Sequence, residues 1–231
     1  MKKIIFSIIP ARGGSKSIPN KNMSLLAGKP LIYYSIKKSI NCKFFDKIIV
    51  SSDSNKILNY SKKFKGIDII KRPKKYSQDK SLTIETIFHA IKKIKIKYNI
   101  LPDVIFIIEP TSPFRTKKTL IRSLNLFKTH KNIDSVISVK KSREVRLKIK
   151  NNEVVHDTNI RRRQERIPNY FEASTVWATT YKSLKKNNSI IGKKPYPLFV
   201  DLIESIDINE KEDLFLSKIL MKSLKNEILK N

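Results

Sequence analysis

Short apolar segments alternate with amphipathic segments between residues 3 and 139 of the chain. The apolar segments are rich in isoleucine and bounded by glycine, proline or polar residues, which is typical of buried strands in a parallel sheet. The expected strands are Lys3–Pro10, Lys47–Ser51, Ile67–Lys71, Val104–Ile108 and Ser135–Val139, and the expected helices are Leu31–Ile40, Asn55–Phe64, Leu82–Tyr98 and Lys117–Thr129. This alternation predicts an α/β fold with a doubly wound, mostly parallel (Rossmann-like) sheet and right-handed crossovers.

The alternation stops after Val139. Residues 140–172 are rich in Lys, Arg and Asn and have little helical periodicity, which indicates an inserted arm with a hairpin around Asn151 and Asn152. The core is expected to resume with two strands and a closing helix, at Ser174–Thr180, Leu198–Val200 and Glu210–Asn226. We therefore expect a single domain over residues 1–231 that carries one arm.

The charge balance is strongly basic, with 49 Lys and Arg against 20 Asp and Glu and a formal net charge of +29. Such a charge raises the possibility of nucleic-acid binding. The lysines are scattered over the expected helices and form no long basic tail, so we do not expect nucleic acid to be a specific partner. The same charge would attract small anionic substrates.

The N-terminus superficially resembles a secretion signal, because Lys2 and Lys3 precede the apolar run Ile4–Ile9. The run is interrupted by Ser7 and stops at Pro10, so a strand explains it better. No apolar run approaches the roughly 18 residues of a membrane span. The single cysteine excludes an intrachain disulfide, and the three histidines are far apart, which argues against structural zinc. We expect a cytoplasmic protein without membrane association.

Residues 8–22 read IIPARGGSKSIPNKN and follow the first expected strand. A P-loop ending at Lys16 would need glycines where Pro10 and Ser15 stand, and the dinucleotide fingerprint fails because Gly13 and Gly14 are adjacent. A different phosphate loop fits, in which the amides of residues 13–15 approach a triphosphate and nearby Arg and Lys side chains neutralise its charge. Three further polar loops, at 51–54, 72–83 and 109–115, follow other strands and are expected at the same sheet edge.

IPARGGSKSIPNKN resembles the N-terminal signature of the CMP-sugar-acid synthetases, the cytidylyltransferases that activate sialic acid and related nonulosonic acids with CTP. Further segments resemble family motifs in the same order: GKPLIYYSI, IIVSSDS, the RP…SxDxSxT loop, EPTSPFR, RRQERIP and SIDINEKEDL. The resemblance covers nearly the whole chain. It implies that the anomeric hydroxyl of a sugar acid attacks the α-phosphate of CTP and that pyrophosphate leaves.

The resemblance also implies roles for individual residues. The catalytic candidates are Arg12, Lys21 and Asp207. The nucleotide-binding candidates are Ala11, Arg12, Gly13, Ser15, Lys16, Lys21, Asn22, Arg72, Asp79, Ser81 and Thr83. Asp79 and Ser81 have an alternative role as N-caps of the helix that begins near Leu82.

Mg²⁺ is the implied cofactor. Asp207 matches the first aspartate of a family motif and is the firmer metal candidate, because Asn209 stands where many members have a second aspartate. Asp213 fits better as a charge in the first turn of the closing helix.

The implied sugar-binding residues are Glu109, Arg115, Arg163 and Gln164. Glu109 replaces a common glutamine, and three roles stay open for it: accepting bonds from sugar hydroxyls, helping the metal, or acting as a general base. The two arginines are candidates for the substrate carboxylate. The usual Asn-Gly-Ala-Ile-Tyr stretch reads ASTVW at 173–177, so the sequence leaves the identity of the acid open among N-acylneuraminate, legionaminate and pseudaminate.

The arm at 140–172 corresponds to the family's dimerisation segment, so the resemblance implies a homodimer in which Arg143, Arg146 or Lys148 reaches the partner's site. Two alternative functions remain. The first is a Kdo (3-deoxy-manno-octulosonate) cytidylyltransferase, although that group usually has Gly-Asp-Glu-Pro where this chain has Glu-Pro-Thr-Ser-Pro. The second is a basic protein without catalysis, which would bind DNA or RNA in a salt-sensitive way.

Overall fold

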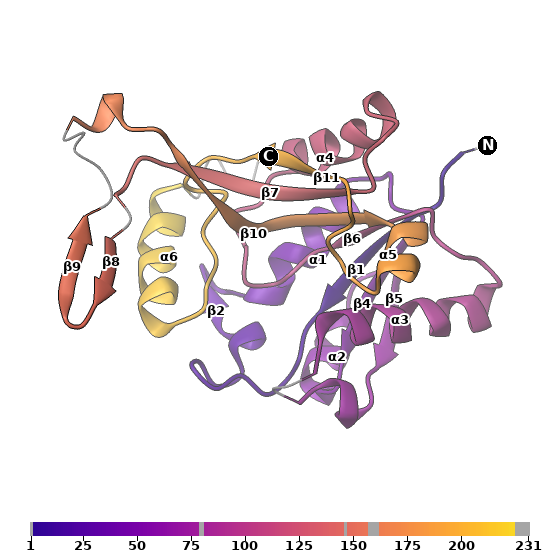
Figure 1. Ribbon diagram of the computed structural model, residues 1–231. Helices are drawn as coiled ribbons and strands as arrows, with labels where there is room; N and C mark the ends of the chain where they lie inside the picture. The colour runs from indigo at the N-terminus through magenta and orange to yellow at the C-terminus, as the bar shows by residue number, and fades with distance from the viewer. Residues whose placement is uncertain (1, 79–80, 146, 157–161, 225–231) are drawn as a thin grey trace.

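A mixed sheet of seven strands forms the centre of the molecule (Figure 1). The computed structural model describes residues 2–78, 81–145, 147–156 and 162–224. The strand order is β11-β7-β10-β6-β1-β4-β5. The strands are β1 (Ile5–Pro10), β4 (Lys47–Ser52), β5 (Ile67–Lys71), β6 (Val104–Ile107), β7 (Ser135–Ser142), β10 (Asn169–Thr180) and β11 (Pro195–Phe199). β10 runs antiparallel to β6 and β7, whereas the other neighbouring pairs are parallel, which confirms the predicted mostly parallel sheet.

Helices cover both faces of this sheet. They are α1 (Leu31–Asn41), α2 (Asn55–Ser61), α3 (Thr83–Tyr98), α4 (Lys117–Thr129), α5 (Tyr181–Asn187) and α6 (Lys211–Ser223). Apolar residues of α1, α2 and α4 pack in one of two large core clusters, and those of α3 and α5 pack in the other, while α6 adds Met221 to a smaller third cluster. In α3, Ile84, Ile87, Ile91 and Ile94 are buried at helical spacing, while lysines occupy the exposed face. The two clusters confirm the doubly wound arrangement.

The smaller elements depart further from expectation. α5 was not predicted, because its sequence YKSLKKN has a single buried apolar residue, Leu184. A short hairpin of β2 (Leu25–Leu26) and β3 (Lys29–Pro30) turns through Ala27 and Gly28, both with positive φ. β7 is longer than predicted and reaches Ser142, which pairs with Asn169 at the start of β10.

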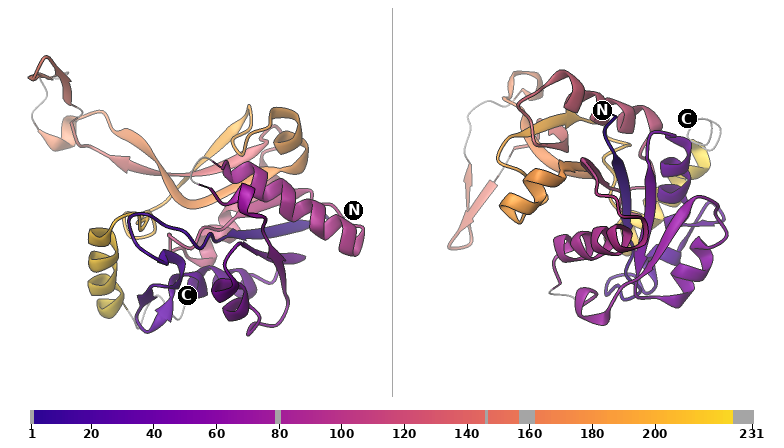
Figure 2. Two further views of the ribbon diagram at one scale, coloured as in Figure 1. Left: turned by 90° about the horizontal axis from the view of Figure 1, so that it is seen from below. Right: turned by 90° about the vertical axis from the view of Figure 1, so that its right-hand side faces the viewer.

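The arm is built on this extended β7–β10 ladder and projects away from the domain (Figures 1 and 2). Its outer part is the hairpin of β8 (Leu147–Lys150) and β9 (Glu153–His156). Asn151 and Asn152 form the turn with φ of 52° and 63°, a conformation that asparagine tolerates well, so the predicted hairpin is confirmed. Within the ranges that the structure describes, no helix combines the length and apolarity required to cross a bilayer.

Candidate active site

A cleft of about 540 Å³ opens at the carboxyl ends of β1, β5 and β6. Eleven of the residues singled out from the sequence line it together: Arg12, Ser15, Lys16, Lys21, Asn22, Arg72, Ser81, Thr83, Glu109, Asp207 and Asn209. The phosphate loop, the 72–83 loop, the 109–115 loop and the acidic segment thus meet at one sheet edge, as expected for an open α/β sheet.

Hydrogen bonds to neighbouring segments stabilise the conformation of the phosphate loop. The buried Ala11 donates its amide to Ser51 O (3.0 Å), and the Asn22 side chain donates to Arg12 O (2.9 Å). The Gly13 amide, expected near a triphosphate, instead donates to Asp53 Oδ1 at 2.9 Å. A Cβ on Gly13 would lie 2.8 Å from Ser54 Cβ, so only glycine fits there. Ala11 and Gly13 therefore shape the loop rather than line the cleft.

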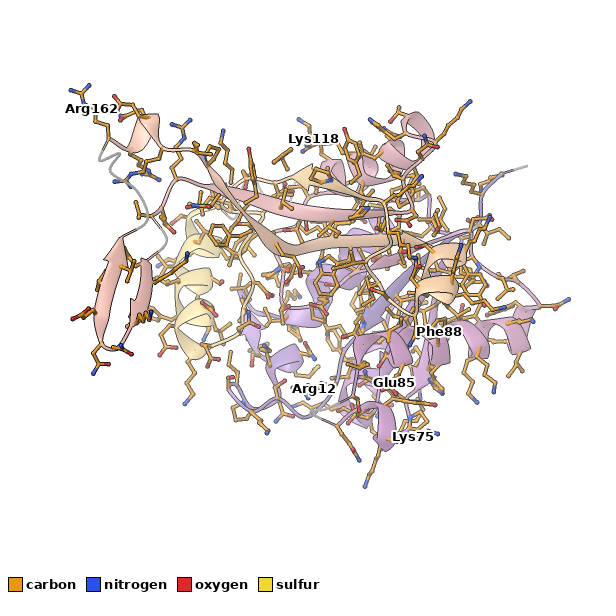
Figure 3. The ribbon with its side chains drawn as sticks, in the orientation of Figure 1. Arg12, Lys75, Glu85, Phe88, Lys118 and Arg162 are labelled. Carbon is orange, nitrogen blue, oxygen red and sulfur yellow. The ribbon has the colours of Figure 1, made fainter. Side chains whose placement is uncertain are left out.

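Lys21 connects the loop to the acidic segment. It begins the 3-10 turn η1 (Lys21–Met23), and its Nζ donates to Ile208 O at 2.9 Å. Partial burial lowers the pKa of Lys21, and the carboxylates of Asp207 and Glu109 oppose that shift. Arg12 lies in the lower part of the view in Figure 3, near the labelled Glu85 and Lys75 of the 72–83 loop and α3.

Arg72 lines the cleft as a buried guanidinium with two donor atoms that no described residue fills. Its side chain is 6% exposed, and NH1 donates to Thr86 Oγ1 at 2.8 Å. NH2 lies 3.9 Å from Asp53 Oδ1, and neither Nε nor NH2 has a hydrogen-bond partner among the described residues. Burial lowers the pKa of Arg72, which Asp53 opposes. A buried guanidinium with unfilled donors is suited to the acceptor atoms of a ligand.

Asp53 is a residue that the sequence reading missed as part of the site. It lay in the quoted SSDS loop, at the carboxyl end of a strand, and that position was the available signal. In the structure its carboxylate contacts both the phosphate loop and Arg72, so it links the two halves of the cleft.

Ser81 does not cap α3. Its Oγ accepts from the Gln78 amide (3.1 Å) and donates to Lys75 O (2.8 Å), so it closes the turn before the helix. The N-cap position is Leu82, whose amide donates to Glu85 Oε2 at 3.1 Å. The alternative role for Ser81 was therefore wrong, and Asp79 lies outside the described residues.

Asp207 faces the cations across the cleft. Its Oδ2 accepts from Ser174 Oγ (3.0 Å) and from Asn209 Nδ2 (3.0 Å). Its Oδ1 is buried and has no hydrogen-bond partner in the described part of the chain. Asp213 Oδ2 accepts from the amides of Asn209 and Glu210 at 2.8 Å each, which confirms its role at the start of α6.

This donor set fits a hard divalent cation. Carboxylate oxygens are the ligands that Mg²⁺ prefers, and Mg²⁺ bound to a nucleotide needs only one or two of them from the protein. The orphaned Asp207 Oδ1 is one such oxygen, and Glu109 supplies a second carboxylate to the same cleft. No group of three or more His, Cys, Asp or Glu side chains gathers as a metal site among the described residues.

Glu109 is an unusual carboxylate. It directly follows β6, and burial, with a smaller contribution from Asp207, raises its pKa to about 7. Arg115 and Lys21 oppose that shift. Glu109 is therefore the carboxyl group of the cleft whose protonation changes near neutral pH.

The other predicted sugar-binding residues lie elsewhere. Arg115 is 1% exposed. It donates to the carbonyl oxygens of Thr175, Glu109 (3.1 Å) and Ser174 (3.4 Å) and to Ser35 Oγ (3.3 Å), so its guanidinium is bonded within the fold rather than directed at a substrate. Arg163 and Gln164 are exposed on the 3-10 turn η3 (Arg163–Glu165) of the arm. The arm, marked by Arg162 in Figure 3, is far from Arg12, so one subunit does not bring these residues to its own cleft.

The comparisons with known proteins agree with this arrangement. A family model described as "Cytidylyltransferase" matches residues 6–210. The chain is 31% identical to the CMP-N,N'-diacetyllegionaminic acid synthase of Legionella pneumophila over 226 residues, which is 94% of this chain and 96% of that protein. It is 35% identical to the N-acylneuraminate cytidylyltransferase of Escherichia coli over 142 residues, 62% of this chain but 32% of that longer protein.

Solved structures agree on the fold. The 4-diphosphocytidyl-2C-methyl-D-erythritol synthase of Anaerococcus prevotii superposes with a TM-score of 0.68, covering 96% of this chain and all of that one, at 16% sequence identity. At this level of identity the likeness establishes the shared fold alone.

Proposed function

The chain belongs to the cytidylyltransferase family, and we propose that it transfers CMP from CTP to the anomeric hydroxyl of a nonulosonic acid, releasing pyrophosphate. The family makes it a nucleotidyltransferase that joins CMP to a sugar acid. The main support for CMP transfer to a nonulosonic acid is the composition of the cleft. Its lining combines the cationic phosphate loop with the carboxylate of Asp207. The two relatives described above act, by their names, on legionaminic and neuraminic acids, and these are the acids we propose to test first.

The cleft residues divide the nucleotide between them. We assign the triphosphate to Arg12, Ser15, Lys16 and Lys21, whose charges stabilise the negative charge that builds up as pyrophosphate leaves. Arg72 and Thr83 line the same cleft and are assigned to the cytosine and ribose, because the unfilled Arg72 donors match carbonyl and hydroxyl acceptors. Catalysis then rests mainly on positioning and charge stabilisation.

Asp207 would hold Mg²⁺ through its orphaned Oδ1, with Asn209 orienting the carboxylate by its hydrogen bond. When bound, the metal supplies charge neutralisation on the phosphate oxygens. Lys21 keeps the acidic segment against the phosphate loop through its bond to Ile208 O.

Glu109 is assigned to the acceptor sugar. In the reaction, the anomeric oxygen forms a bond to the α-phosphorus of CTP. The bond between the α-phosphorus and the oxygen that bridges to the β-phosphate breaks, so pyrophosphate leaves. The proton of the anomeric hydroxyl then needs an acceptor. Glu109 lines the cleft beside Asp207 and is the candidate to accept that proton or a hydrogen bond from a neighbouring hydroxyl.

The arm supports a homodimer. The β8–β9 hairpin stands clear of the domain (Figure 2), and it exposes Leu147 (54%), Ile149 (75%) and Val154 (61%). Exposed apolar side chains on a projecting hairpin fit a second copy of the chain as partner. In such a dimer Arg163 and Gln164 would serve the partner's cleft rather than their own; Arg146, another arm candidate, lies outside the described residues.

The test is a pyrophosphate-release assay with CTP, Mg²⁺ and a panel of sugar acids that includes N-acetylneuraminate, legionaminate, pseudaminate and Kdo. Release with a nonulosonic acid is expected, and release with Kdo alone would favour the Kdo alternative. Arg12→Ala should reduce turnover by about 10²- to 10³-fold, the cost of one oxyanion-stabilising donor, without a change in the circular dichroism spectrum. Absence of release with every acid, together with salt-sensitive RNA or DNA binding, would replace the proposal by the nucleic-acid alternative.

A further inference from the structure

β10 is irregular where it passes the cleft. Its pairing with β7 is regular from Asn169 to Glu172 and again from Trp177, and the register shifts between Glu172 and Trp177. The four residues 173–176 therefore form a bulge in the middle of a long strand. Bulges re-aim side chains and are frequent beside active sites.

Hydrogen bonds to three other elements hold this bulge in place, two of them through side chains and the third through a backbone carbonyl. From β7, Ser138 Oγ bonds Val176 O (3.0 Å) and accepts from the Val176 amide (2.9 Å). From the 109–115 loop, Ser112 Oγ donates to Ser174 O (2.9 Å) and Arg115 donates to Ser174 O and Thr175 O. From the segment before Asp207, Glu204 O accepts from Thr175 Oγ1 at 2.6 Å.

These contacts orient the hydroxyl of Ser174 toward Asp207. Ser174 Oγ donates to Asp207 Oδ2 at 3.0 Å, and Asn209 Nδ2 donates to the same oxygen. Two donors on Oδ2 fix the plane of the carboxylate and leave Oδ1, buried and without a partner among the described residues, for another ligand. Partners that orient a metal ligand typically change metal affinity by 10- to 100-fold when removed.

We propose that Ser174 is a positioning residue that holds Asp207 for a divalent cation, and that the β10 bulge exists to present it. The inference rests on the proposed function, because it deepens the role assigned there to Asp207. Arg115 then stabilises the bulge through its bonds to Ser174 O and Thr175 O, instead of making the predicted contact with the sugar acid.

The experiment measures Mn²⁺ binding to the full chain by the electron paramagnetic resonance signal of the free ion, with protein alone and with protein plus CTP, against a protein-free CTP blank. Ser174→Ala should raise the Mn²⁺ dissociation constant about tenfold or more, and Ser174→Thr, which keeps the hydroxyl, should stay close to wild type. Ser174→Gly provides a second hydroxyl-free variant. Ser61→Ala, which removes a buried hydroxyl from α2 that bonds Ile57 O, is the matched control and should not change Mn²⁺ affinity.

The outcomes separate the two proposals. If wild type binds Mn²⁺ and both hydroxyl-free variants bind it equally well, the role of Ser174 is overturned and the proposed function stands. If Ser174→Thr loses as much affinity as Ser174→Ala in folded protein, the hydroxyl is not the cause and the inference is likewise overturned. If wild type itself binds no Mn²⁺ with or without CTP, the metal assignment of Asp207 fails and the inference fails with it.

Discussion

Lys21 Nζ donates a hydrogen bond to Ile208 O at 2.9 Å and so joins two segments 187 residues apart in the chain. The lysine belongs to the phosphate loop, and Ile208 lies between Asp207, which is assigned to the metal, and Asn209, which orients the Asp207 carboxylate. Ile208 is itself fully buried, and its amide donates to Thr111 O at 2.8 Å. The backbone of Ile208 therefore bonds both the phosphate loop and the loop that follows β6.

Replacing Lys21 by methionine should remove both the charge and this contact. Because Lys21 is assigned to the leaving phosphates and also holds the acidic segment, we expect kcat/KM for CTP to fall by about 10²- to 10³-fold, with about 1 kcal/mol lost in the free energy of unfolding. Steady-state kinetics and urea unfolding measure the two effects. Lys185→Met, on the exposed side of α5, makes the same charge change and should leave both unchanged. Normal turnover in the Lys21 variant would contradict the assignment.

Arg115→Leu should destabilise the protein rather than weaken substrate binding selectively. The guanidinium is buried and bonds the carbonyl oxygens of Glu109, Ser174 and Thr175, which the variant would leave unsatisfied. We expect a loss of about 3–5 kcal/mol in the free energy of unfolding, measured by urea titration. Arg122→Leu on the exposed face of α4 is the control. A variant with wild-type stability and a raised KM for the sugar acid would restore the role predicted from the sequence.

Arg115 also shows where sequence reasoning reaches its limit. Strands and helices were predictable because their signal is local, as in the isoleucine spacing of α3, and the loops after β1, β5 and β6 followed from the topology of the sheet. Two of the carbonyl partners of Arg115, those of Ser174 and Thr175, lie about 60 residues along the chain. Nothing in the local pattern distinguishes a buried arginine from one that binds substrate. The same holds for Ser174, because its contact with Asp207 depends on the β10 bulge, which the hydrophobic periodicity of the sequence does not predict.

The Glu109 carboxyl predicts how stability varies with pH. Its pKa is raised from 4.5 to about 7 in the folded state. Between these values the folded protein keeps a proton that the unfolded chain has lost, so the free energy of unfolding falls as pH rises, and the full cost is present above pH 7. Glu109→Gln removes this dependence. In EDTA, the variant should gain about 1–3 kcal/mol relative to wild type between pH 5 and pH 8.

Urea unfolding at several pH values measures this difference. Glu165→Gln, on the exposed turn of the arm, is the control and should follow the wild-type curve. If the Glu109→Gln and wild-type curves run parallel from pH 5 to pH 8, the carboxyl is not held protonated by its surroundings.

Gly13→Ala tests the shape of the phosphate loop independently of its charge. The added Cβ would lie 2.8 Å from Ser54 Cβ, so the loop must shift away from Asp53, which accepts the Gly13 amide bond. We expect a loss of about 1–3 kcal/mol in stability and weaker CTP binding by calorimetry. Ser54 is the N-cap residue of α2 but makes no side-chain capping bond, so Ser54→Gly alone should cost little. The double variant removes the clash and should recover much of the stability and affinity. If the double variant binds CTP no better than Gly13→Ala, the close approach of residues 13 and 54 is not what requires a glycine in this loop.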